Sequence, residues 1–202
     1  MMRRRVPIVA AAVVVLGVAG CGGSGDSDSA TAESTTSVSP TTSSEAGAPS
    51  TPAAGGDFSS LLIKPMDIGP DVVAEGVPIP NPGGTTGTGQ TFKTSDGTRA
   101  IVVTIAVFPD PAAAANMIAP MRDAITDKVD GEQKPVDVGS NGFMVEGPAK
   151  QKSMEISEVV FTQGRALVDV EYDSAAGDPA PSEAVLDVAR KQAAAVATGL
   201  PG

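Results

Sequence analysis

The chain has 202 residues and a formal net charge of −10, with 14 Lys and Arg against 24 Asp and Glu. It contains no His, no Trp, one Tyr and one Cys, and 41% of its residues are hydrophobic, enough for a core. Without His there is no Ser-His-Asp or Cys-His catalysis and no imidazole metal ligand, and one Cys provides neither an internal disulfide framework nor a thiolate zinc site. Because a chain this acidic repels phosphodiesters and anionic headgroups, we expect no nucleic-acid binding and no electrostatic docking on membranes.

Residues 1–20 have the organisation of an export signal. Arg3, Arg4 and Arg5 give a positive start, and an apolar run of about 13 residues follows at 6–18. A helix of that length, rising about 1.5 Å per residue, is too short to cross roughly 30 Å of hydrocarbon. We therefore expect a signal peptide at 1–20.

The end of this segment, Val18-Ala19-Gly20-Cys21, resembles the bacterial lipobox, in which an aliphatic residue and two small ones precede a Cys that becomes the mature N-terminus. The resemblance implies cleavage before Cys21, a diacylglyceryl group with acyl chains such as palmitate on its sulfur, and anchoring at the outer face of the cell membrane or cell envelope. Two acyl chains hold a protein stably where one is marginal, since each buried methylene contributes about 0.8 kcal/mol. The alternative is an uncleaved helix in which Cys21 is incidental.

Residues 21–56 are predicted to form a disordered tether behind the lipidated Cys21. They are mostly Ser, Thr, Ala, Gly and Pro, with four acidic residues and no hydrophobic period. Such a segment cannot bury enough apolar surface to offset the entropy of ordering it. About 35 flexible residues reach roughly 30–35 Å, so the folded domain is expected to stand off the membrane. The runs at 35–37 and 40–44 are typical of O-glycosylated stalks, and a linker without sugar fits them equally well.

Residues 57–202 are predicted to form a single globular α+β domain, an antiparallel sheet with two main helices packed on it in the order ββα-ββα. Residues 76–89 are rich in Pro and Gly and are expected to be irregular. The expected elements are strands at 91–94 and 99–108 around the turn at 95–97, a helix from Asp110-Pro111 with a kink or break near Ala119, short strands at 136–138 and 143–146, strands at 154–163 and 165–172 around Gly164, and a last helix after Asp178-Pro179.

Two details of these strands lead to further expectations. In the strand at 154–163 the apolar residues change parity between Ile156 and Val159, which predicts a bulge near Glu158. In the strand at 165–172, Asp169 and Glu171 alternate on one face, which is expected to see water.

A family resemblance follows from the lipobox, the tether and the order of the later segments. These are a central apolar strand, a helix, Gly142-Phe143, and the run at 159–164 that turns into another apolar strand before a final helix. Over residues 101–200 this order resembles mycobacterial and related actinobacterial cell-envelope lipoproteins of the LpqN type. The resemblance implies a PsbP-like α/β sandwich and an accessory role in the envelope.

The sequence predicts no catalytic, cofactor-binding or metal-binding motif. The stretch at 84–91 has the glycine spacing of a phosphate-binding loop, but Gln90 stands in the lysine position and a strand follows, so we interpret it as a loop. Gly139-Ser140-Asn141-Gly142 reads as a turn, since no His activates Ser140. Asp169, Glu171 and Asp173 could face a hard cation, but alternate residues of a strand lie about 6.5–7 Å apart, which favours a solvated face.

The sequence therefore predicts a non-enzymatic, lipid-anchored envelope protein that binds an apolar ligand or an envelope protein partner. Two alternatives remain open: a hydrolase using carboxylates or a Ser-Lys pair, since acidic residues distant in the chain can meet in space, and a passive spacer or sensor domain. Binding of an apolar ligand requires that four residues line an opening rather than pack into a closed interior: Met117, Met121, Phe143 and Phe161.

Overall fold

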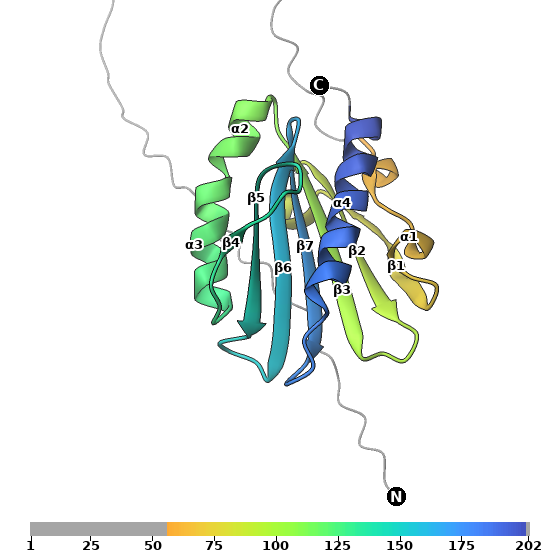
Figure 1. Cartoon of the computed structure of the whole chain (residues 1–202). Helices are drawn as coiled ribbons and strands as arrows, with labels where there is room; N and C mark the ends of the chain where they lie inside the picture. Colours follow the sequence, from red (N-terminus) through yellow and green to blue (C-terminus); the bar gives the residue numbers. More distant parts are fainter. Residues whose placement is uncertain (1–55, 201–202) are drawn as a thin grey trace, which may run out of the picture. The chain divides into compact units, whose positions relative to one another are not determined.

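The structure is a computed structural model and describes residues 56–200. Seven strands form one antiparallel sheet in the order β1-β2-β3-β7-β6-β5-β4 (Figure 1). The strands are β1 (Val72–Pro80), β2 (Gly87–Thr94), β3 (Arg99–Val107), β4 (Lys134–Pro135), β5 (Ser140–Pro148), β6 (Met154–Gln163) and β7 (Ala166–Ala175). The helices are η1 (Ser59–Leu61), α1 (Pro65–Ile68), η2 (Pro82–Gly84), α2 (Pro111–Asn116), α3 (Ile118–Lys128) and α4 (Ser182–Gly199). The α+β class is confirmed, and Cys21 lies outside the described residues.

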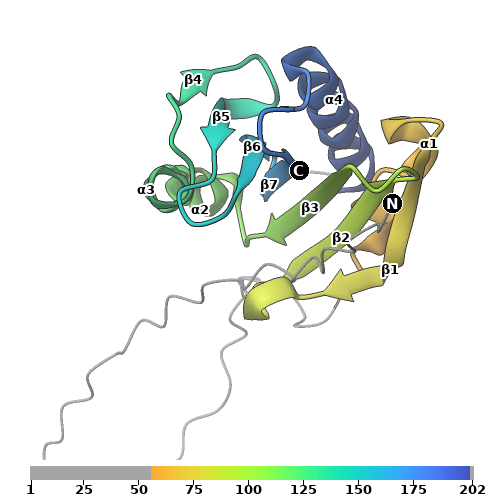
Figure 2. The same cartoon turned by 90° about the horizontal axis from the view of Figure 1, so that it is seen from below.

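Helices lie on both faces of the sheet (Figure 2). On one face, α4 packs on β6 and β7 over the larger core cluster, which includes Val159, Phe161 and Val170. On the other face, α2 and α3 pack over a smaller cluster that includes Phe143 and Val160. Within residues 56–200, no helix has both the length and the apolar character needed to cross a bilayer.

Two local sequence signals are confirmed. The Asp-Gly pair joins β2 to β3, with Gly97 at φ 70° as the tight turn requires. Asp110 caps α2, because its carboxylate accepts a hydrogen bond of 2.8 Å from the Ala113 amide, and Pro111 takes the first helical position.

The predicted ββα-ββα order is wrong. Residues 76–80, the start of the segment expected to be irregular, belong to the edge strand β1, so three strands precede α2 and four more lie between α3 and α4. β1 carries no alternating pattern because nearly all of it is exposed, and its register against β2 shifts between Glu75 and Ile79. Pro78 and Pro80 are tolerated because an edge strand does not need every N–H for pairing.

The bulge expected near Glu158 is not found, since β6 pairs with β7 in one unbroken register over its whole length. The apolar parity changes because both faces of β6 are covered. Ile156 and Val160 belong to the cluster beneath α3, whereas Val159 and Phe161 belong to the cluster beneath α4.

Three boundaries differ from expectation. The first helix breaks at Met117, between α2 and α3, two residues before the predicted Ala119. The strand expected at 136–138 is instead the two-residue β4 at Lys134–Pro135. α4 begins at Ser182 after Pro181, whereas the Asp178 carboxylate, expected to start the helix, pairs with Arg99 Nη2 at 3.1 Å.

Candidate functional site: a carboxylate cluster beneath α3

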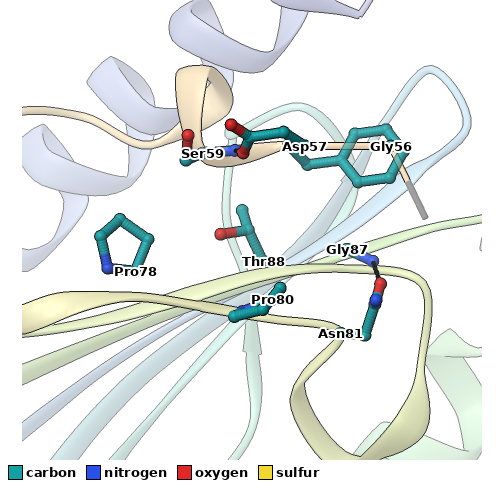
Figure 3. Close-up of a pocket in the computed structure, with 9 residues that line it drawn as sticks. Gly56, Asp57, Ser59, Pro78, Pro80, Asn81, Gly87 and Thr88 are labelled. Carbon is teal, nitrogen blue, oxygen red and sulfur yellow. Dashed lines mark hydrogen bonds between the residues drawn. The ribbon is translucent and has the colours of Figure 1, made fainter.

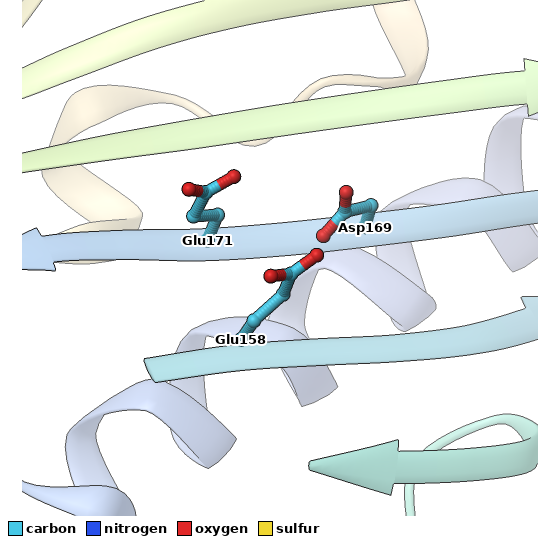
Figure 4. Close-up of side chains that lie close together, drawn as sticks. All are labelled: Glu158, Asp169 and Glu171. Atoms are coloured by element: carbon cyan, nitrogen blue, oxygen red, sulfur yellow. The ribbon is translucent and has the colours of Figure 1, made fainter. Parts of the chain in front are cut away.

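Three acidic side chains from two neighbouring strands converge on the α3 face of the sheet. Asp169 and Glu171 alternate along β7, and Glu158 of β6 stands directly opposite Glu171 in the register (Figure 4). One carboxylate oxygen from each of the three residues lies within 4.8 Å of the other two. The spacing along β7 alone would keep two carboxylates apart, but neighbouring strands lie only about 4.8 Å apart, so Glu158 closes the cluster.

One lysine neutralises part of this charge. Lys128 is the last residue of α3, and its Nζ lies 2.5 Å from Glu158 Oε2 and 3.1 Å from Glu171 Oε2. It is placed there because Ile125 and Val129, one on each side of it in the chain, are buried in the smaller core cluster. The helix end therefore covers a face that was expected to see water, and only 1% of Glu158 is exposed.

Burial changes the protonation of these groups. It raises the pKa of Glu158 to about 7, against the opposing effect of the Lys128 charge. The pKa of Asp169 is also raised well above its usual range, by burial and then by the Glu158 charge. Burial and the neighbouring Glu171 charge raise the pKa of Asp173 to about 6. For Lys128, burial acts to lower the pKa, but the charges of Glu158 and Glu171 outweigh it and raise the pKa.

The cluster can hold protons or cations. Among the described residues, buried carboxylate oxygens without a hydrogen-bond partner include Glu158 Oε1, Asp169 Oδ1 and Asp173 Oδ1. The three carboxylates of Glu158, Asp169 and Glu171 could ligate a metal, but calcium takes six to eight oxygens, and the Lys128 ammonium already lies between two of the three groups. The donor set fits an organic cation better than a metal ion.

A separate hollow of about 350 Å³ lies where residues 56–59 pass over β1 and β2 (Figure 3). Pro78, Pro80 and Thr88 line one side, and Asn81 turns the chain there with its Oδ1 accepting a hydrogen bond of 3.2 Å from the Gly87 amide. A second hollow of about 230 Å³ lies beside β4 and β5. Polar or charged residues contribute to both, such as Thr88 and Asn81 in the first and Glu132 and Glu146 in the second.

The four residues expected to decide between a closed interior and an opening are packed. Phe143 and Phe161 are fully buried, in the clusters on opposite faces of the sheet. Met117 and Met121 pack, partly buried, against the cluster beneath α3. None of the four lines either hollow described above.

The two near-motifs fall where the sequence predicted loops and turns. The glycine-rich stretch at 84–91 runs from η2 into β2, without a helix after it. Ser140 begins β5, and Asn141 has φ 56° in the turn.

Sequence reasoning missed Glu158 and Lys128 as members of the cluster. The signal for Glu158 was present, since it interrupts the apolar run from Ile156 to Phe161, but it was interpreted as a change of parity. Nothing local points to Lys128, because its partners lie 30 residues or more along the chain.

No family model and no curated protein matches the chain. Among solved structures, the chain is similar to the crystal structure of the extracellular domain of PknH from Mycobacterium tuberculosis. The two share 13% sequence identity with a TM-score of 0.48, and the match covers 67% of this chain and 94% of that chain.

Proposed function

We propose that the chain is a lipoprotein of the cell envelope, anchored through Cys21 to the outer face of the membrane, whose domain is a non-enzymatic binding module for an envelope protein partner. The observation that carries this proposal is Val18-Ala19-Gly20-Cys21, placed directly after a basic start and a short apolar run. The resemblance over residues 101–200 further supports an actinobacterial lipoprotein of the LpqN type. The acidic chain leaves the covalent lipid as the means of holding the membrane.

The packing favours a protein partner over an apolar ligand. Ligand pockets for apolar molecules are mostly apolar clefts of about 300–1,000 Å³ that enclose most of the ligand. The aromatic and methionine side chains that could line such a pocket are packed against the sheet, as Phe143 and Phe161 illustrate. These contacts instead support binding of a protein partner to the surface of the domain.

The carboxylate cluster favours binding over hydrolysis. A general acid must reach the bond that it protonates, within about 3 Å or through one water molecule. Glu158 has a raised pKa suited to such a role, but it is 1% exposed beneath α3 and bonded to Lys128. A substrate in solution does not reach it.

The anchor is tested by expressing the full chain in an actinobacterial host fed an alkyne-labelled palmitate. The wild-type chain is expected in the membrane fraction with label, and its N-terminal peptide should begin at a diacylglyceryl Cys21. Cys21→Ser should lose both label and membrane association. The double variant with Ser24→Cys restores one thiol outside the motif and should not recover them. A free thiol at Cys21, or an intact segment 1–20 on a cytosolic protein, would refute the proposal.

A further inference from the structure

The half of the sheet formed by β1, β2 and β3 lies beyond the reach of α2 and α3, which contact β6 and β7 (Figure 2). In β3, residues that face α4, such as Val103 and Ile105, are completely buried, whereas the alternate residues are only partly buried. Of these alternate residues, Ala106 at the end of β3 packs against the cluster beneath α3, whereas Ala100, Val102 and Thr104 belong to neither core cluster. We call this surface the open face; it consists of Thr91, Lys93, Ala100, Val102 and Thr104, and Glu171 and Asp173 of β7 lie along its border beside the end of α3.

The open face leads directly into the carboxylate cluster. The register of β3 against β7 places Thr104 opposite Asp169, Val102 opposite Glu171 and Ala100 opposite Asp173. Opposed residues of antiparallel strands point to the same face, and these β3 side chains are short. An extended chain lying on β3 can therefore bring its side chains to the β7 carboxylates without displacing a helix.

The charges on this side are unbalanced. Glu158 and Glu171 share the ammonium of Lys128, whereas at Asp173 the field of Lys152 is stronger than that of Lys128. On the open face itself, the other cation is Lys93, which is paired with Glu75. Asp173 Oδ1 is buried, and among the described residues no basic side chain forms an ion pair with Asp173.

Charge also decides between possible occupants of the open face. The segment at 22–56 of this chain contains four acidic residues and no Lys or Arg, so the cluster repels it. A second copy carries the same net charge of −10 and meets the same repulsion. A guanidinium or ammonium on a partner supplies both the missing charge and the missing donors.

We infer that the open face binds an extended segment of a partner protein that carries Arg or Lys at alternate positions, with the cationic groups received by Glu171 and Asp173 at its border. The spacing fits because alternate residues of an extended chain and alternate carboxylates of β7 both repeat at about 6.5–7 Å. This inference rests on the proposed binding function and specifies the chemistry of the partner, but it does not depend on the lipid anchor.

The test uses the full mature chain in non-ionic detergent and two fluorescein-labelled eight-residue peptides. One carries two arginines separated by one residue, and its twin carries citrulline, an uncharged isostere, at both positions. Fluorescence anisotropy at about physiological salt should show saturable binding of the arginine peptide, with affinity for the citrulline peptide lower by about tenfold or more.

Three variants separate the open face from general attraction to an acidic protein. Asp173→Asn should weaken arginine-peptide binding about tenfold or more, because it removes a charged acceptor. Glu183→Gln changes the net charge equally but lies exposed on α4, and it should leave the affinity within about twofold. Val102→Arg keeps every carboxylate and places a guanidinium opposite Glu171, so it should abolish peptide binding while the far-ultraviolet spectrum stays unchanged.

Equal affinity for the citrulline peptide, or equal losses from Asp173→Asn and Glu183→Gln, would overturn the inference. Calcium binding that is lost in Asp173→Asn, with no peptide binding, would overturn it in favour of a metal site. These results would not contradict the lipid anchor at Cys21, and a free thiol at Cys21 would not contradict peptide binding. The two proposals can therefore be refuted independently.

Discussion

The folded chain should lose stability as the pH rises from about 4.5 to 7, because Glu158 binds its proton more tightly in the folded state. Its pKa is about 7 when folded, against 4.5 for an unperturbed glutamate. A group with a raised folded pKa contributes stability that is fully present below the unfolded pKa and lost as the pH passes the folded pKa. A difference of this size corresponds to about 3 kcal/mol, since one pKa unit corresponds to about 1.4 kcal/mol.

Other groups either act in the same direction or lie outside this window. The raised pKa values of Asp169 and Asp173 also favour the folded state at lower pH. Asp96 acts oppositely, because hydrogen bonds from Thr94 and Thr98 lower its pKa to about 2, but its contribution changes only below about pH 4.

The assay is urea unfolding of the full chain carrying Cys21→Ser, followed by circular dichroism at about pH 5, 6, 7 and 8. The free energy of unfolding should be about 2–3 kcal/mol lower at pH 8 than at pH 5. Glu158→Gln should reduce that difference to about 1 kcal/mol, and Glu183→Gln should leave it unchanged. A wild-type stability that is constant or rises between pH 5 and 8 would refute the reasoning, as would a slope that persists in Glu158→Gln.

Three further substitutions test the packing by the same urea assay. Lys128→Met leaves buried carboxylates unpaired and should cost about 2–3 kcal/mol at pH 8, with a smaller loss at pH 5, where Glu158, with its pKa of about 7, is protonated. Gln192→Leu removes two buried hydrogen bonds that join α4 to the segment at 61–63, and it should cost about 2–4 kcal/mol and speed amide exchange there. Gly87→Ala would bring its Cβ to 1.9 Å from the Ile105 carbonyl oxygen and should cost more than about 3 kcal/mol, whereas Gly97→Ala, with open space around it, should cost about 1 kcal/mol.

The elements that the sequence predicted are those whose signals are local. The Asp-Gly turn between β2 and β3 needs only the positive φ of Gly97, and the start of α2 needs only the carboxylate of Asp110 near the first free amides. β1 was missed because an exposed edge strand has no buried face to impose alternation. At the second Asp-Pro pair the local signal was wrong, since α4 begins only at Ser182 and Asp178 pairs with Arg99 of β3.

The candidate site shows the same division between local and long-range information. The alternation of Asp169, Glu171 and Asp173 placed them correctly on one face of β7. Whether that face is exposed to solvent depends on where α3 ends relative to the sheet. The sequence pattern of β7 does not predict this position. The approach of Glu158 depends on the pairing of β6 with β7, and Lys128 on the packing of α3, so the cluster becomes visible only in three dimensions.

A contribution to the stability of the fold does not explain the carboxylate cluster. Replacing buried ion pairs with apolar residues of similar size is often neutral or stabilising, and here the lysine falls short of the carboxylate charge around it. The same sheet contains well-packed apolar residues directly beside the cluster, such as Leu167 and Val160, so an apolar solution was available at these positions. Stability lost in the free protein can be recovered when a partner brings the missing cation, because anything that binds only the folded state stabilises it. Carboxylates that lower the stability of the free protein, next to the open face of the sheet, are therefore what is expected of a binding surface for a cationic partner.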